Sequence, residues 1–197
     1  LVRFLFAYAA KIIDTKYLPY MGYLALLPAF GFSYISLLPV YVDEKLNLGA
    51  DAFGGIQSIS SIGALLSTSL LASSGDIKIK GKLLFITTII YGLGVILMGF
   101  TGEIFIAFGI AIFIGGSQSV FRTCVSSTIV SVTEEKYRGR MISMTMLDMG
   151  VASIASILAG RITDLISVSY GMLFCGVMCT VIGIVTFTIH KKLIKIW

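Results

Sequence analysis

The sequence predicts an all-α membrane protein with six transmembrane helices, arranged as two repeats of three helices. Of the 197 residues, 57% are hydrophobic and only 13% are charged, whereas about a quarter of the residues in a soluble domain are charged. The apolar residues also gather in six long runs, at residues 19–42, 52–74, 83–100, 104–130, 141–165 and 170–189.

Each run meets or approaches the roughly 20 residues that a helix needs to cross about 30 Å of hydrocarbon. Backbone polar groups must be paired internally there, which leaves helices or a closed barrel, and these runs lack the alternation of barrel strands. Because the connections are short, we expect consecutive helices to be antiparallel neighbours. The expected division is an interfacial helix or linker at 1–16, a six-helix bundle at 17–190 and a basic tail at 191–197.

Lysine and arginine fall at alternate ends of the six runs, which predicts the orientation because positively charged loops stay in the cytoplasm. The opposite loops hold four acidic residues and only Lys45. This pattern places both termini in the cytoplasm and the chain in the cell membrane. The basic residues on the predicted cytoplasmic side are Arg3, Lys11, Lys16, Lys78, Lys80, Lys82, Lys136, Arg138, Arg140, Lys191, Lys192 and Lys195.

The first segment, residues 2–13, combines aromatic and aliphatic side chains with Arg3 and Lys11 and is too short to cross. An amphipathic helix lying on the membrane surface fits this pattern, and a disordered linker is the alternative. The chain begins at Leu1 without a methionine, so we expect a fragment of a longer protein.

Several functions are excluded or disfavoured. The basic residues lie in short connections and form no continuous patch for nucleic acid. The three cysteines lack the spacing of a metal or redox site, so we expect them to pack as small apolar residues, with no metal and no cofactor. The serines, Asp148 and His190 provide no nucleophile, base and orienting group at suitable spacing, so we do not expect an enzyme.

Two charged residues inside the predicted spans need a reason, because an unpaired charge near the bilayer centre costs several kcal/mol. Arg122 and Asp148 both lie about 10 to 12 Å from the predicted cytoplasmic face, and we expect them to form an ion pair. The pair is either part of a substrate or proton pathway or a latch between two helices. Gln118, Arg122 and Ser126 recur every four residues and share one helix face, which favours a border with a wet cavity.

Other polar and irregular features fall in the first and second spans. Gln57 is a further candidate for the pathway, whereas the spans at 83–100 and 170–189 hold no charged residue and are expected to face lipid. Pro28 and Gly31 interrupt the first span, and proline inside a helix removes a hydrogen bond and bends the helix. This bend is either a moving gate or a static kink.

With these residues in view, the chain resembles the C-terminal half, helices seven to twelve, of the major facilitator superfamily. Within it, the segments LLPVYVDEKLNLGADAFGGIQSISSIGALL, SVTEEKYRGRMISM and ILAGRITDLISVSYGMLF resemble the branch of siderophore and macrolide exporters. The loop SSGDIKIKGKLL is similar to a degenerate copy of the superfamily's gating motif. The resemblance therefore implies gating roles for residues in that loop and in the turn before the fifth span, namely Asp76, Lys78, Arg138 and Arg140.

The resemblance implies alternating access, with helices seven, eight, ten and eleven lining the cavity. It also implies proton-coupled export of a hydrophobic or amphiphilic small molecule. The expected partners are membrane lipid, protons, a small-molecule substrate, and either a missing N-terminal half or a second copy. The alternative is a six-helix channel or a permease subunit without its own energy coupling.

Overall fold

The structure, a computed structural model, describes residues 18–73, 80–132, 135, 139 and 148–189. An all-α fold with six long helices is confirmed, and the helix ends lie close to the predicted ones wherever both are described. The helices are α2 (Leu18–Glu44), α3 (Ala50–Ser73), α4 (Lys80–Phe100), α5 (Ile104–Val132), α7 (Asp148–Leu165) and α8 (Val168–Ile189).

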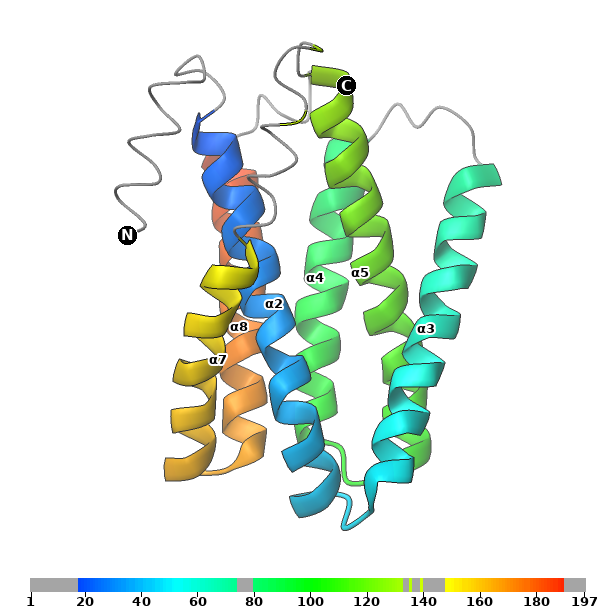
Figure 1. The fold of residues 1–197 in the computed structure, drawn as a ribbon, viewed down its shortest axis with the longest axis vertical. Helices are drawn as coiled ribbons and strands as arrows, with labels where there is room; N and C mark the ends of the chain where they lie inside the picture. Colours follow the sequence, from blue (N-terminus) through cyan, green and yellow to red (C-terminus); the bar gives the residue numbers. More distant parts are fainter. Residues whose placement is uncertain (1–17, 74–79, 133–134, 136–138, 140–147, 190–197) are drawn as a thin grey trace.

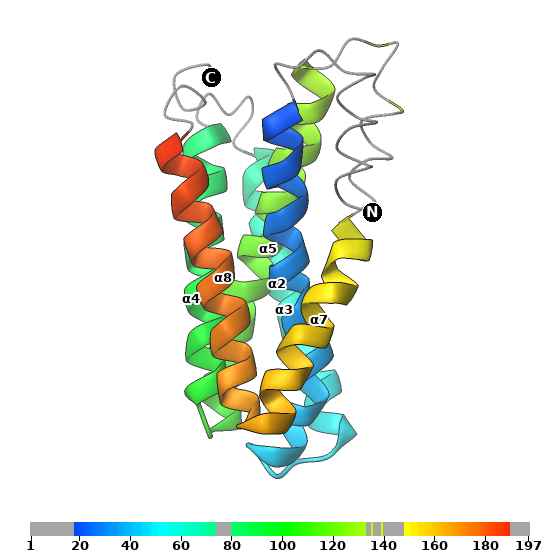
Figure 2. The same cartoon turned by 90° about the vertical axis from the view of Figure 1, so that its left-hand side faces the viewer.

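The six helices form an elongated bundle in which they run alternately up and down (Figure 1). In this view α2 and α5 occupy the middle, α7 flanks α2, α3 flanks α5, and α4 and α8 lie behind. The first residues of α2 and the last residues of α8 are at the same end of the bundle (Figure 2). This arrangement follows from an even number of antiparallel crossings.

The pairing of helices shows two interlocked repeats of three. The first helix of each repeat packs against the second and third helices of the other: α2 contacts α7 and α8, and α5 contacts α3 and α4. The two third helices, α4 and α8, pack on each other. The weak compositional repeat seen in the sequence therefore has a counterpart in the packing.

One expectation about neighbours is wrong. Within the described residues, α3 and α4 do not pack extensively against each other, and neither do α5 and α7, although each pair is consecutive in the chain. Connection length does not force such contact, because the six residues at 74–79 can span up to about 20 Å. The choice of partner instead follows the faces that carry small residues.

Glycine decides the α3–α5 crossing. A Cβ atom on Gly115 would collide with the backbone carbonyl of Ser60, and one on Gly63 would collide with the backbone of Ile112. The two backbones therefore touch directly. In lipid there is no hydrophobic drive between helices, so such close approach supplies the attraction through van der Waals contact.

The α4–α8 crossing is built in the same way. A Cβ on Gly176 would lie 2.6 Å from the carbonyl oxygen of Gly92. In α4 and in α8, 44% of the apolar stretch that could cross the membrane is buried inside the bundle, against 11% in α3. The expectation that α4 and α8 are lipid-facing supports is therefore half correct: each has one exposed apolar face, with Leu93 or Val181 on it, and one buried face.

Within the described residues, four helices have the length and the apolar composition to cross a membrane. They are α3, α4, α5 and α8. The described part of α7 has 18 residues and includes Asp148, Arg161 and Asp164. The sequence places the start of this span at residue 141, outside the described residues.

We expect Gly115→Ala to lower the thermal unfolding temperature of the purified protein in detergent. The added methyl group meets a backbone carbonyl that cannot move aside, and overpacking costs about 1 to 3 kcal/mol. Gly109→Ala on the same helix is the matched control, since no atom lies within 4 Å of the position that its added methyl group would take and alanine favours a helix over glycine. Equal unfolding temperatures for the two variants would contradict the proposed crossing.

Candidate functional site

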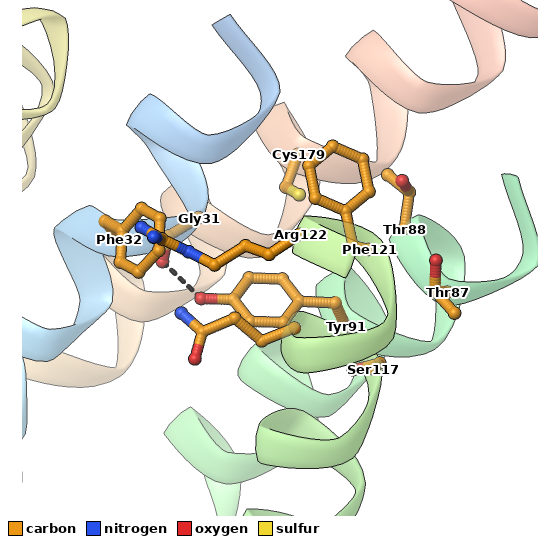
Figure 3. A pocket seen from close by; sticks show the side chains of 10 residues that line it. Gly31, Phe32, Thr87, Thr88, Tyr91, Ser117, Phe121, Arg122 and Cys179 are labelled. Carbon is orange, nitrogen blue, oxygen red and sulfur yellow. Dashed lines mark hydrogen bonds between the residues drawn. The ribbon is translucent and has the colours of Figure 1, made fainter. Parts of the chain in front are cut away.

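A small cavity lies inside the bundle between α2, α4, α5 and α8. Its volume is about 30 Å³, enough for about two or three water molecules, since a water needs about 10 to 15 Å³ on this measure. Figure 3 shows the side chains that surround it. The lining residues are Gly31, Phe32, Thr87, Thr88, Tyr91, Ser117, Gln118, Phe121, Arg122 and Cys179.

Tyr91 fixes the floor of the cavity by joining α4 to α2. Its hydroxyl donates a hydrogen bond of 2.5 Å to the carbonyl oxygen of Gly31 (Figure 3). A Cβ on Gly31 would stand 2.9 Å from the Tyr91 ring, so glycine makes room for the tyrosine. The ring of Tyr34 meets Tyr91 edge to face, with centroids 6.0 Å apart. The bond and the ring contact hold two helices that otherwise touch little.

The threonine and serine hydroxyl groups near the cavity all donate hydrogen bonds within their own helices. Thr87 and Thr88 donate to the carbonyl oxygens of Leu83 and Leu84 at 2.8 Å, and Ser117 donates to that of Phe113 at 2.7 Å. Such bonds to the preceding helical turn satisfy the donor inside the helix. These side chains therefore offer no free O–H group to the cavity.

Arg122 stands at the open side of the cavity. Its guanidinium carbon lies 4.3 Å from the ring centroid of Phe32, within the range of a cation–π contact, and Figure 3 shows the side chain reaching across Tyr91 to that ring. Arg122 is exposed, whereas Thr87, Thr88, Tyr91 and Ser117 behind it are buried. The contact bridges α5 and α2, which do not pack extensively against each other in the described residues.

Comparison with known proteins decides the family. The sequence profile of the Major Facilitator Superfamily matches residues 21–195, which is nearly the whole chain. The chain belongs to the Major Facilitator Superfamily. Members of this superfamily are membrane transporters of small molecules and not enzymes, so the transporter class predicted from the sequence is confirmed at this level.

The chain is also similar to the staphyloferrin A transporter of Staphylococcus aureus (strain NCTC 8325 / PS 47). The two are 25% identical over 168 residues, which cover 85% of this chain and 42% of the relative. The chain therefore spans less than half the length of that curated transporter. The bundle described above corresponds to one half of a superfamily fold.

Three of the residues singled out in the sequence line this cavity. Gln118 and Arg122 lie on the same face of α5, and Gly31 faces them from α2. Gln57 lies elsewhere, half-buried on α3, where its backbone carbonyl oxygen accepts a hydrogen bond from the Ser61 hydroxyl. Pro28 is in the interior of α2, but its side chain is outside the described part, so the gate stays a prediction.

The predicted pair of Arg122 and Asp148 also stays a prediction. Asp148 begins α7, and its side chain lies outside the described residues. The described part of α7 packs on α2 and α8 and not extensively on α5, so the two helices are not the neighbours that the pairing argument assumed. The proposed gating residues Asp76, Lys78, Arg138 and Arg140 lie outside the described residues as well.

Sequence reasoning missed Tyr91, Phe32 and the two threonines. Tyr91 had a signal that was not used: it is a tyrosine inside a run expected to face lipid, and its hydroxyl needs a partner there. Phe32 had no such signal in the sequence, because its contact with Arg122 depends on how α2 and α5 face each other. The expected apolar packing of Cys124, Cys175 and Cys179 is confirmed, since all three are buried.

We expect Tyr91→Phe to reduce the free energy of unfolding by about 0.5 to 1.5 kcal/mol, the net value of one hydrogen bond. The Gly31 carbonyl keeps its bond within α2, so the loss stays modest. Tyr170→Phe, at an exposed site on α8, is the control and should leave stability unchanged. The measurement is unfolding in detergent with added denaturant. The same effect for both variants would count against the Tyr91 contact.

Proposed function

We infer that this chain is the C-terminal half of a proton-coupled transporter that exports a hydrophobic or amphiphilic small molecule by alternating access. The observation that best supports this function is the cavity between α2, α4, α5 and α8, which Arg122 and Gln118 border on the side where α2 and α5 do not pack extensively in the described residues. A charge is costly inside a membrane, and such residues commonly mark a substrate or ion pathway.

The extent of the match supports the half-transporter interpretation. The chain spans 42% of the length of its relative, and its six helices are paired as two interlocked triplets. In the proposed assembly, a second six-helix bundle faces α2, α3, α5 and α7 across the opening. An N-terminal half of the same protein is the proposed partner, and a second copy of this chain is the alternative.

Charge distribution supports the proposed orientation. Lys80 and Lys82 lie at the start of α4, at the end of the bundle where α2 begins. Asp43, Glu44 and Glu103 lie at the other end. Because basic residues are retained on the cytoplasmic side, we propose that both termini of the chain are cytoplasmic.

The relative's name provides a candidate cargo, staphyloferrin A. At 25% identity we propose only that this chain also transports a small molecule, and we use the named compound as the first probe. Export and proton coupling are proposed from the resemblance to the exporter branch. A channel or permease subunit has no specific support among the described residues, and the experiment below separates it from a transporter.

The test is transport by the native-length protein in proteoliposomes whose lumen is more acidic than the medium. We expect staphyloferrin A to accumulate in the lumen above its outside concentration, because protons leaving the lumen would drive it inward. Mass spectrometry of filtered vesicles measures the uptake, and liposomes without protein are the control.

A protonophore should abolish this accumulation. Uptake that only equilibrates with the medium, and that does not respond to the protonophore, would contradict proton coupling and favour the channel. No uptake beyond that of empty liposomes would contradict the proposed cargo class.

A further inference from the structure

Arg122 differs from the other charged side chains in the described part of the chain because it lies well inside a helix. Lys80 and Lys82 begin α4, Asp51 begins α3, and Arg161 lies within the last five residues of α7. By contrast, α5 extends ten residues beyond Arg122 to its end at Val132. A cation at this depth needs an anionic or aromatic partner.

Phe32 meets only part of that need. A guanidinium that stacks on an aromatic ring uses its flat face, and its five N–H donors point outward in the plane. Within the described residues, no acceptor for a hydrogen bond from Arg122 is found, and the side chain is exposed. The ring thus orients the guanidinium and leaves its donor edge available.

The surrounding groups leave few free hydrogen-bond donors beside Arg122. The nearby threonine and serine hydroxyl groups donate their hydrogen bonds to carbonyl oxygens of their own helices, as described above for Thr87, Thr88 and Ser117. Hydrogen-bond donors at the cavity are therefore concentrated on Arg122 and on the amide of Gln118, one turn earlier on the same helix. An arginine fork beside an amide suits the two oxygens of a carboxylate.

The size and lining of the cavity limit what enters it. A volume of about 30 Å³ admits a group of a few atoms and not a whole molecule. Phe121 and Tyr91 offer apolar surface beside the donors. A ligand with a charged head and an apolar body matches this combination.

We propose that Arg122 and Gln118, with Phe32 as a positioning residue, form an anion-recognition subsite that binds the carboxylate of an amphiphilic substrate. The proposal rests on the proposed transport function and narrows its substrate class. The carboxylate fits between the guanidinium and the amide, and the apolar body lies along the opening between α2 and α5.

The test is equilibrium binding of pyrenebutyrate, a fluorescent amphiphilic carboxylate, to the native-length protein in nanodiscs of zwitterionic lipid. Pyrenebutanol, which has the same ring and an uncharged end, is the matched ligand, and empty nanodiscs are subtracted. We expect the wild type to prefer the carboxylate. Arg122→Gln should weaken carboxylate binding about tenfold or more, as expected for loss of a hydrogen bond to a charged group, and leave alcohol binding unchanged.

Three further variants separate recognition from folding. Arg122→Lys keeps the charge but lacks the fork, so its affinity should lie between those of the wild type and Arg122→Gln. Phe32→Tyr should keep the preference for the carboxylate, while Phe32→Leu should reduce it by releasing the guanidinium. Arg161→Gln, at an exposed site near the end of α7, is the matched control and should behave as the wild type.

Equal carboxylate affinity for the wild type and Arg122→Gln would overturn the proposal, since the guanidinium would then be committed elsewhere, for instance to Asp148. Loss of both ligands in Arg122→Gln but not in Arg122→Lys would also overturn it, by showing a structural role. If anionic lipid in the nanodiscs weakens carboxylate binding more for the wild type than for Arg122→Gln, the subsite binds a lipid headgroup and the substrate assignment is overturned. None of these results affects the proton-driven transport measured above, so the two proposals fail separately.

Discussion

Close approach of helix backbones is the constraint on which the rest of this structure depends. In hydrocarbon the chain must satisfy its backbone hydrogen bonds within helices, and apolar side chains then gain little by choosing a helix over lipid. Glycines supply the missing preference. Gly63 and Gly115 let α3 meet α5, and Gly92 and Gly176 let α4 meet α8, so these two crossings have defined faces.

These crossings also position the candidate site. Since α5 is packed against α3 and α4, and α2 against α7 and α8, the two first helices of the repeats face each other across an opening. Tyr91 joins α4 to α2 through the carbonyl oxygen of Gly31, and Arg122 joins α5 to α2 at Phe32. The α4–α8 crossing joins the two groups of helices on the side of the cavity away from Arg122.

The sequence was sufficient for the fold class, the six helices and most of their ends, because a span is a local property of composition and length. It also identified Arg122 and Gln118, since a polar residue in a long apolar run is conspicuous. The sequence did not predict which helices pack side by side. We expected α3 to lie beside α4, but the packing partner of a helix depends on glycines that lie on helices far apart in the sequence. Gly31 was predicted to be part of a gate or a static kink, and the structure adds that it makes room for Tyr91, a contact with no signature along the chain.

The interlocking of the two triplets is tested most directly by disulfide cross-linking in a variant whose three native cysteines are replaced by alanine. Ser67→Cys on α3 combined with Gly116→Cys on α5 should form a disulfide rapidly on oxidation, because a Cβ on Gly116 would touch the Ser67 hydroxyl. Ser67→Cys combined with Ile86→Cys on α4, at matching depth, should not. Rapid cross-linking of α3 to α4, with none of α3 to α5, would contradict the pairing of helices and the site that depends on it.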